Sequence, residues 1–205
     1  MEFRFTPEQI ALRQEARNFV EKKIAPIADE LDATYDFPAE VVDQISKAGF
    51  YKYVVPEEYG GKGVSSVNLC ILREEFARIS TNADEILIMQ GLGGYPIVRF
   101  GNESQKAKYL PSFADGSKLV NFCLTEPGAG SDVAGLQTTA RIEGDYYVLN
   151  GRKCFMSKPG FTDVSVVFAK TDPNAGSKGI SGFIVDRAES SYDVTTDRLM
   201  FECNI

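Results

Sequence analysis

The N-terminal region has its apolar residues at helical spacing. From residue 12 to residue 31 they recur every three or four positions, as on the buried face of an amphipathic α-helix. The segment Thr6–Gln9 just before them has the form of a capping box, with proline at the first helical position. We therefore predict a helix that begins at Pro7 and bends near Pro26.

Further stretches show the same periodicity. Residues 38–48 predict a helix that stops at Gly49, and residues 65–79 predict another, capped by Ser65 or Ser66. Helical signals separated by glycines follow at residues 83–90, 96–100 and 104–110. We interpret the intervening glycines as helix boundaries, so this part of the chain is predicted to be mostly helical.

After residue 115 the pattern changes to short β-prone runs separated by turn residues. The predicted strands are residues 120–124, 139–142, 146–149, 154–156, 164–170 and 182–185. The segment Glu143–Asp145 is a candidate hairpin turn, and strands at this spacing are typical of an antiparallel barrel or sandwich. The predicted fold class is therefore α+β, with an N-terminal all-α domain of residues 1–115 and a small β domain of residues 116–205.

Composition limits the possible functions. The net charge of −7 argues against sequence-independent binding to nucleic acid, which needs clustered Lys and Arg. Histidine is absent, which excludes Ser-His-Asp and Cys-His mechanisms, and we predict no metal site. No apolar run approaches the about twenty residues that span a bilayer, and no signal or transit pattern is present. With four scattered cysteines and no CxxC pair, we predict a cytoplasmic protein with reduced thiols.

The strongest chemical signal is the run Leu-Thr-Glu-Pro-Gly-Ala-Gly-Ser-Asp at residues 124–132. Gly128 and Gly130 can adopt positive φ and have no Cβ to keep a ligand away. Thr125 and Ser131 supply hydroxyl groups that donate or accept hydrogen bonds. Loop chemistry alone is compatible with a ligand-binding loop and favours an ordinary glycine-rich turn.

Residues 122–132, followed by Tyr-Val-Leu-Asn-Gly-Arg-Lys at residues 147–153, resemble the middle-domain signature of the acyl-CoA dehydrogenase family. The resemblance extends from the N-terminal helical region through Val185. It implies a helical domain followed by a small antiparallel β-barrel, an FAD cofactor and oxidation of an acyl-CoA thioester to the 2,3-enoyl-CoA in fatty acid metabolism. It also implies electron-transfer flavoprotein as the acceptor and a homo- or hetero-oligomer, in the family commonly a homotetramer.

The resemblance further implies the residues of the site. Thr125 and nearby backbone N–H groups are expected at the pyrimidine edge of the flavin, and Ser131 near the FAD pyrophosphate and the pantetheine arm of the substrate. The family's Trp-Ile-Thr flavin segment matches residues 155–157, which keep an aromatic face and a hydroxyl near flavin N5. Without the upstream motif, Phe155 and Met156 read as core strand residues. The implied cofactor-binding residues are Phe122, Cys123, Leu124, Thr125, Gly130, Ser131, Phe155, Met156 and Ser157.

The resemblance assigns no catalytic base. In the family this base is a glutamate of a C-terminal helical domain, and the sequence stops at Ile205. We therefore expect a truncated form or fragment that is inactive alone. Two alternatives stay open: a flavin oxidase or monooxygenase of the same superfamily that uses oxygen, and a non-catalytic truncated paralogue or partner subunit without FAD.

Overall fold

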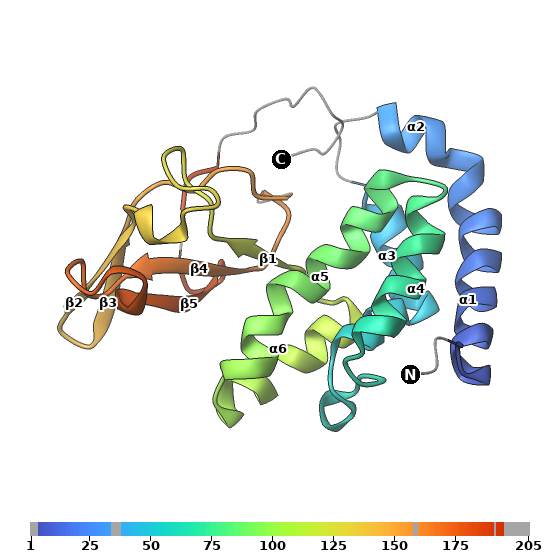
Figure 1. The fold of residues 1–205 in the computed structure, drawn as a ribbon, viewed down its shortest axis with the longest axis horizontal. Helices are drawn as coiled ribbons and strands as arrows, with labels where there is room; N and C mark the ends of the chain where they lie inside the picture. The colour runs from blue at the N-terminus through green and yellow to red at the C-terminus, as the bar shows by residue number, and fades with distance from the viewer. Residues whose placement is uncertain (1–3, 34–37, 158–159, 191, 195–205) are drawn as a thin grey trace.

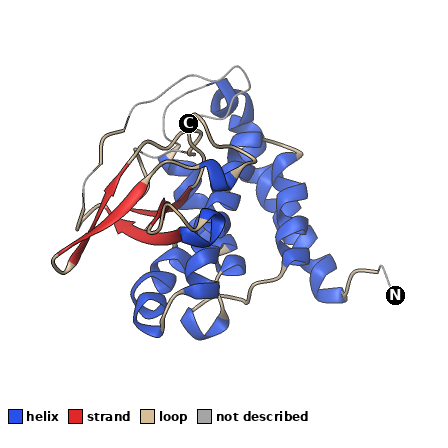
Figure 2. Ribbon diagram, turned by 60° about the vertical axis from the view of Figure 1, so that its left-hand side comes forward, coloured by secondary structure: helices blue, strands red, loops and turns tan. Residues whose placement is uncertain are grey.

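A computed structural model describes residues 4–33, 38–157, 160–190 and 192–194. Within this part of the chain the helices precede the strands, and the helical region and the sheet lie side by side (Figure 1). Figure 2 shows the sheet packed along one side of the helices. This arrangement confirms the predicted α+β class with an N-terminal helical region followed by a β region.

The N-terminal helices begin and end close to the capping residues and turns that the sequence indicates. The hydroxyl of Thr6 accepts from the Gln9 N–H and the Gln9 side chain accepts from the Thr6 N–H, as predicted for a capping box. Residues 20–27 depart from α geometry as a π turn followed by a 3-10 turn that contains Pro26. The helices are α1 Pro7–Phe19, α2 Ala28–Ala33, α3 Ala39–Ala48, α4 Ser66–Ala77, α5 Thr81–Phe100 and α6 Glu103–Asp115.

Helix α5 differs from the predicted helix boundaries. The separate helices expected at residues 83–90 and 96–100 are one continuous helix of 20 residues. Its glycines serve close packing: a Cβ on Gly93 would lie 2.9 Å from the backbone carbonyl carbon of Val120 in strand β1, Val120–Cys123. Gly93 therefore permits the contact between α5 and β1, and it does not end the helix.

Within the described residues, strands β2 Thr139–Glu143, β3 Tyr146–Asn150, β4 Val164–Lys170 and β5 Ile180–Asp186 form one mixed sheet with β1. Strand β1 pairs with β4 in parallel, β5 pairs antiparallel along the other edge of β4, and the β2–β3 hairpin joins β4 through Thr139 and Lys170. The expectation of antiparallel pairing was therefore wrong for β1 and for β2, which both pair with β4 in parallel. The long connection from β1 to β4 allows a parallel crossover.

A buried glutamine joins the helices to the first strand. The Gln90 Nε2 donates to the carbonyl oxygens of Phe113 and Lys118, at 3.1 and 2.8 Å, and its Oε1 accepts from the Val120 N–H at 3.2 Å. These bonds satisfy every polar atom of a side chain that is only 2% exposed. Helices α5 and α6 thus hold the beginning of β1 in place, and β1 leads directly into residues 124–132.

No helix within the described ranges is both long and apolar enough to cross a membrane.

Candidate functional site

The two faces of β1 have different surroundings. The half-buried Phe122 packs on Phe168 of β4, with ring centroids 4.9 Å apart, on the face of the sheet that meets α5 and α6. Cys123 points to the opposite face, because successive strand residues alternate, and its thiol donates to the Asn121 side chain at 3.2 Å. Burial raises the pKa of the Cys123 thiol to about 11, so the thiol is protonated at neutral pH.

The loop after β1 begins with a tight turn. The backbone groups of Glu126 and Ala129 exchange two hydrogen bonds, at 3.0 and 3.1 Å, across this turn. Neither Gly128 nor Gly130 has positive φ, so the loop does not use the left-handed backbone that glycine permits. A Cβ at either glycine would meet nothing within 4 Å, and Ser131 is exposed. The loop therefore presents an open backbone surface.

A second predicted segment lies against this loop. The N–H of Cys154 donates to the carbonyl oxygen of Thr125 at 2.9 Å, which brings residues 154–157 beside the end of β1. The strand predicted at residues 154–156 is not formed, because Phe155 has φ 55°, in the left-handed region that non-glycine residues rarely adopt. The structure thus brings together the two segments expected to contact a flavin.

The three side chains of this second segment point in different directions. Phe155 is 63% exposed, which is incompatible with a core strand residue. Met156 lines a cavity on the face of the sheet opposite Phe122. Ser157 lines a small hollow beside Ile86 and Met89 of α5. Phe155 is therefore exposed to solvent, whereas Ser157 faces a hollow that residues of α5 also line.

A buried ion pair, which the sequence interpretation missed, connects the two segments. The Lys153 Nζ lies 2.7 Å from the Glu126 Oε1 and donates to the Leu124 carbonyl oxygen at 3.0 Å. The two side chains are only 7% and 4% exposed. The Glu126 carboxylate also accepts from the N–H groups of Gln137 and Thr138, at 2.5 and 3.0 Å, and from the Thr138 hydroxyl. Glu126 lies in the first motif and Lys153 in the second, and this placement was the available signal for the pair. Charged residues are usually exposed, so the sequence alone predicts two surface charges.

The electrostatics of Glu126 follow from these contacts. Burial disfavours its charged form, but the hydrogen bonds from the Gln137 N–H, Lys153 and Thr138 outweigh burial and lower the pKa of Glu126 to about 2. The carboxylate is therefore ionised throughout the neutral range. A carboxylate that binds so many donors and is so weakly basic is poorly suited to remove a proton from carbon.

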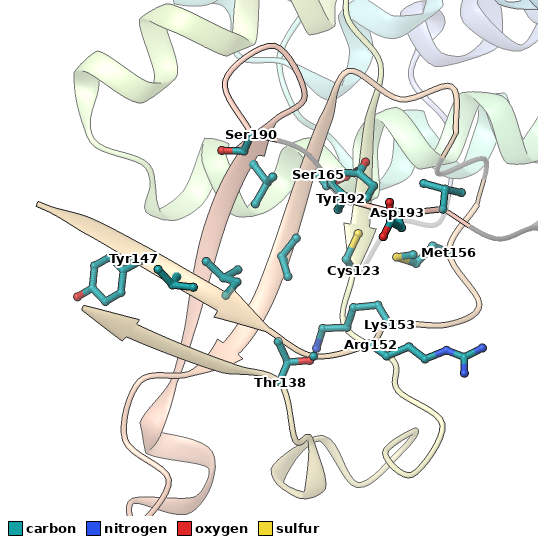
Figure 3. A pocket seen from close by; sticks show the side chains of 16 residues that line it. Cys123, Thr138, Tyr147, Arg152, Lys153, Met156, Ser165, Ser190, Tyr192 and Asp193 are labelled. Carbon is teal, nitrogen blue, oxygen red and sulfur yellow. Dashed lines mark hydrogen bonds between the residues drawn. The ribbon is translucent and has the colours of Figure 1, made fainter. Parts of the chain in front are cut away.

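A cavity of about 700 Å³ lies on the face of the sheet opposite Phe122 (Figure 3). Cys123 and Met156 are the predicted flavin residues that line it, and Lys153 lies at one side. In the same cavity the hydroxyls of Ser165 and Tyr192 lie 2.8 Å apart. This cavity is therefore distinct from the surface where the loop and Phe155 are displayed. Among the described residues no group of three or more His, Cys, Asp or Glu side chains could hold a metal ion.

Comparison with known proteins identifies the family. Residues 6–117 match the family model of the acyl-CoA dehydrogenase N-terminal domain, and residues 121–200 match that of the middle domain. The chain therefore belongs to the acyl-CoA dehydrogenase family.

Individual relatives are similar over most of this chain. The 3-(aryl)acrylate reductase of Clostridium sporogenes is 46% identical, and the alignment covers 89% of this chain and 48% of the relative. The caffeyl-CoA reductase-Etf complex subunit CarC of Acetobacterium woodii is 43% identical, with 89% and 48% covered. Among solved structures, the acyl-CoA dehydrogenase complexed with FAD from Bacillus anthracis superposes with a TM-score of 0.83 at 34% identity, covering 98% of this chain and 34% of that chain. This chain spans about half the length of the curated relatives that it matches.

Proposed function

We propose that this chain holds the FAD- and acyl-CoA-contacting surface of an acyl-CoA dehydrogenase, which oxidises an acyl-CoA thioester to the 2,3-enoyl-CoA. The observation that carries the proposal is the hydrogen bond from Cys154 to Thr125, because it joins the backbones of the two segments that the resemblance assigns to the flavin. Membership of the family and the FAD-bound relative from Bacillus anthracis support the choice of cofactor.

The residues at this surface fit FAD. Phe155 offers an exposed aromatic face for stacking. The hydroxyls of Thr125 and Ser131 have no hydrogen-bond partner among the described residues, and Gly130 leaves space for a close approach of a ligand to the backbone. The surface therefore combines a stacking ring with free hydroxyl groups and accessible backbone.

Each group has a role in binding the cofactor and the substrate. FAD, when bound, supplies the hydride acceptor. The Thr125 hydroxyl and neighbouring N–H groups would hold the pyrimidine edge of the ring, where fixed donors stabilise developing negative charge. Ser131 would meet the pyrophosphate and the pantetheine arm. The base that removes the α-proton is not assigned to any described residue.

Two features of the relatives extend the proposal. One curated relative is named a 3-(aryl)acrylate reductase and the other a subunit of a caffeyl-CoA reductase-Etf complex. These two names favour, as a second candidate function, the reverse reaction that reduces a 2,3-double bond. The name of the Acetobacterium woodii relative includes an Etf complex, which supports electron-transfer flavoprotein as the redox partner. A cytoplasmic location and an oligomeric assembly are part of the same proposal.

Titration of the purified chain with FAD tests the proposal. We expect a bound flavin with an absorbance band at about 450 nm, set by the chemistry of the cofactor itself. Protein that is colourless once unbound FAD has been removed would refute both the dehydrogenase and the oxidase and would favour a subunit without flavin. For a chain extended by its downstream coding sequence, anaerobic bleaching by an acyl-CoA supports the dehydrogenase, whereas rapid reoxidation of the reduced flavin by air supports the oxidase.

A further inference from the structure

We infer that Glu126 and Lys153 form a clasp that fixes residues 124–131 and 154–157 as one unit, and that both are positioning residues for the flavin surface. Their role toward the flavin rests on the proposed function. Their role in joining the two segments does not, because it concerns contacts within the chain.

The contacts of Lys153 all point to the loop after β1. Its ammonium group binds the Glu126 carboxylate and the carbonyl oxygen of Leu124, at 2.7 and 3.0 Å. The next residue, Cys154, donates its N–H to the carbonyl oxygen of Thr125 at 2.9 Å. Lys153 and Cys154 thus hold three successive residues at the start of the loop, 124–126.

The far side of the clasp is equally fixed. Glu126 accepts from the backbone N–H groups of Gln137 and Thr138, which lie just before β2. Because a carboxylate with several fixed donors cannot rotate freely, the position of Glu126 is determined by the sheet. The clasp therefore transmits the position of the sheet to the loop and to the residues after Lys153.

Burial distinguishes this pair from a surface salt bridge. The side chains of Lys47 and Asp43 in α3 are 74% and 53% exposed, whereas those of Lys153 and Glu126 are 7% and 4% exposed. Burying two charges costs more than burying apolar side chains of the same size, so a buried pair is weak evidence for stability alone. A role in geometry accounts better for charges placed between the two segments.

The backbone of Phe155 gives an independent reason for such a constraint. A non-glycine residue at φ 55° is strained, and strain of this kind persists only where the surroundings hold it. Lys153 and Cys154, the two residues before Phe155, are both bonded to the loop. The clasp thus holds the turn that displays the exposed Phe155 ring.

Two substitutions in the full chain test the clasp, with a matched control. Lys153→Met and Glu126→Gln each break the ion pair. Lys118→Met breaks another pair with a buried carboxylate, Lys118 with Asp186 at 2.6 Å, at the opposite end of the sheet. In that control the carboxylate keeps a backbone donor, the N–H of Ala188, as Glu126 keeps its own after loss of Lys153.

The first measurement needs no cofactor. Hydrogen exchange of the Cys154 amide reports the bond to Thr125 directly. We expect it to accelerate about tenfold or more in both clasp variants, the effect of losing one charge-assisted hydrogen bond, and to stay unchanged in Lys118→Met. Exchange at Cys154 that remains at the wild-type rate in folded clasp variants would overturn the proposal.

The second measurement follows FAD binding by the quenching of flavin fluorescence. We expect the dissociation constant to rise about tenfold in the clasp variants and to stay at the wild-type value in Lys118→Met. Lys153→Arg keeps the charge and should recover part of the affinity. Equal weakening in the clasp variants and the control would show a general loss of stability and would refute a positioning role.

The two measurements separate this inference from the proposed function. If the wild-type chain takes up no FAD, the proposed function fails, while exchange at Cys154 still decides whether the clasp joins the segments. If Lys153→Met does not fold, the double variant Glu126→Gln/Lys153→Met removes both charges and leaves no buried ion alone. The same exchange comparison then applies to that variant.

Discussion

The left-handed backbone of Phe155 makes a prediction about stability that can be tested without any ligand. Phe155→Ala and Phe155→Gly both remove the exposed ring, so they differ only in backbone preference. A left-handed conformation costs an L-residue about 1–2 kcal/mol and costs glycine almost nothing. Glycine usually destabilises by about 0.5–1 kcal/mol relative to alanine, because it loses more entropy on folding. At φ 55° the first effect wins, and we expect Phe155→Gly to be more stable than Phe155→Ala by about 0.5–1 kcal/mol.

Tyr146 provides the matched control. It is also an exposed aromatic residue, 77% exposed at the start of β3, and it does not have positive φ. Here the order should reverse, with Tyr146→Ala more stable than Tyr146→Gly by about 0.5–1 kcal/mol. Urea unfolding of the four variants gives both differences from their midpoints, provided that the slopes agree. If Phe155→Ala is as stable as Phe155→Gly, the turn is not left-handed in solution. The clasp is then not needed to hold the backbone of residue 155.

Three further predictions concern the flavin surface and the buried pair. Thr125→Val should weaken FAD binding by about 1 kcal/mol through loss of one hydrogen bond, while Thr139→Val in β2 should leave the affinity unchanged. Equal affinities of the two variants in a fluorescence titration would show that Thr125 does not contact the edge of the flavin ring. Phe155→Trp enlarges the stacking face and should tighten FAD binding by about 0.5–1 kcal/mol, and weaker binding would show that the ring does not stack. The pKa of Glu126 is lowered from 4.5 to about 2, so its ionised form stabilises the fold above pH 4.5 and this contribution, about 3 kcal/mol, is lost as the pH falls toward 2. Glu126→Gln should lack that part of the acid-induced loss measured by urea unfolding, and an acid profile parallel to wild type would contradict the assignment.

The helix ends could be predicted from the sequence because their signals are local. Each signal acts within four residues of a helix end. The Thr6 capping box begins α1, Ser65 caps the start of α4, and the left-handed Gly49 ends α3. The role of Gly93 in α5 could not be predicted from the sequence, because it depends on a distant strand. A Cβ on Gly93 is excluded by Val120, which no pattern within the helix reveals.

The candidate site shows the same division between local and distant causes. The residue types of the loop 124–132 alone favour an ordinary glycine-rich turn. Only the resemblance to a family assigns this loop to a ligand and joins it to residues 155–157. The clasp could not be predicted, because Glu126 and Lys153 are 27 positions apart and each would ordinarily be a surface charge. Their meeting depends on how β1, β2 and β3 are arranged in the mixed sheet.

The misread strand at residues 154–156 is itself informative about function. Cys-Phe-Met favours extended backbone, and a propensity of this kind is overridden only when tertiary contacts oppose it. Here the opposing contacts are the bonds from Lys153 and Cys154 to the loop after β1. The result is a strained, exposed aromatic residue, which contributes little to the core and costs free energy to maintain. Since local rules tend to fail where a binding surface is being shaped, the failure at Phe155 supports the assignment of this turn to the cofactor surface.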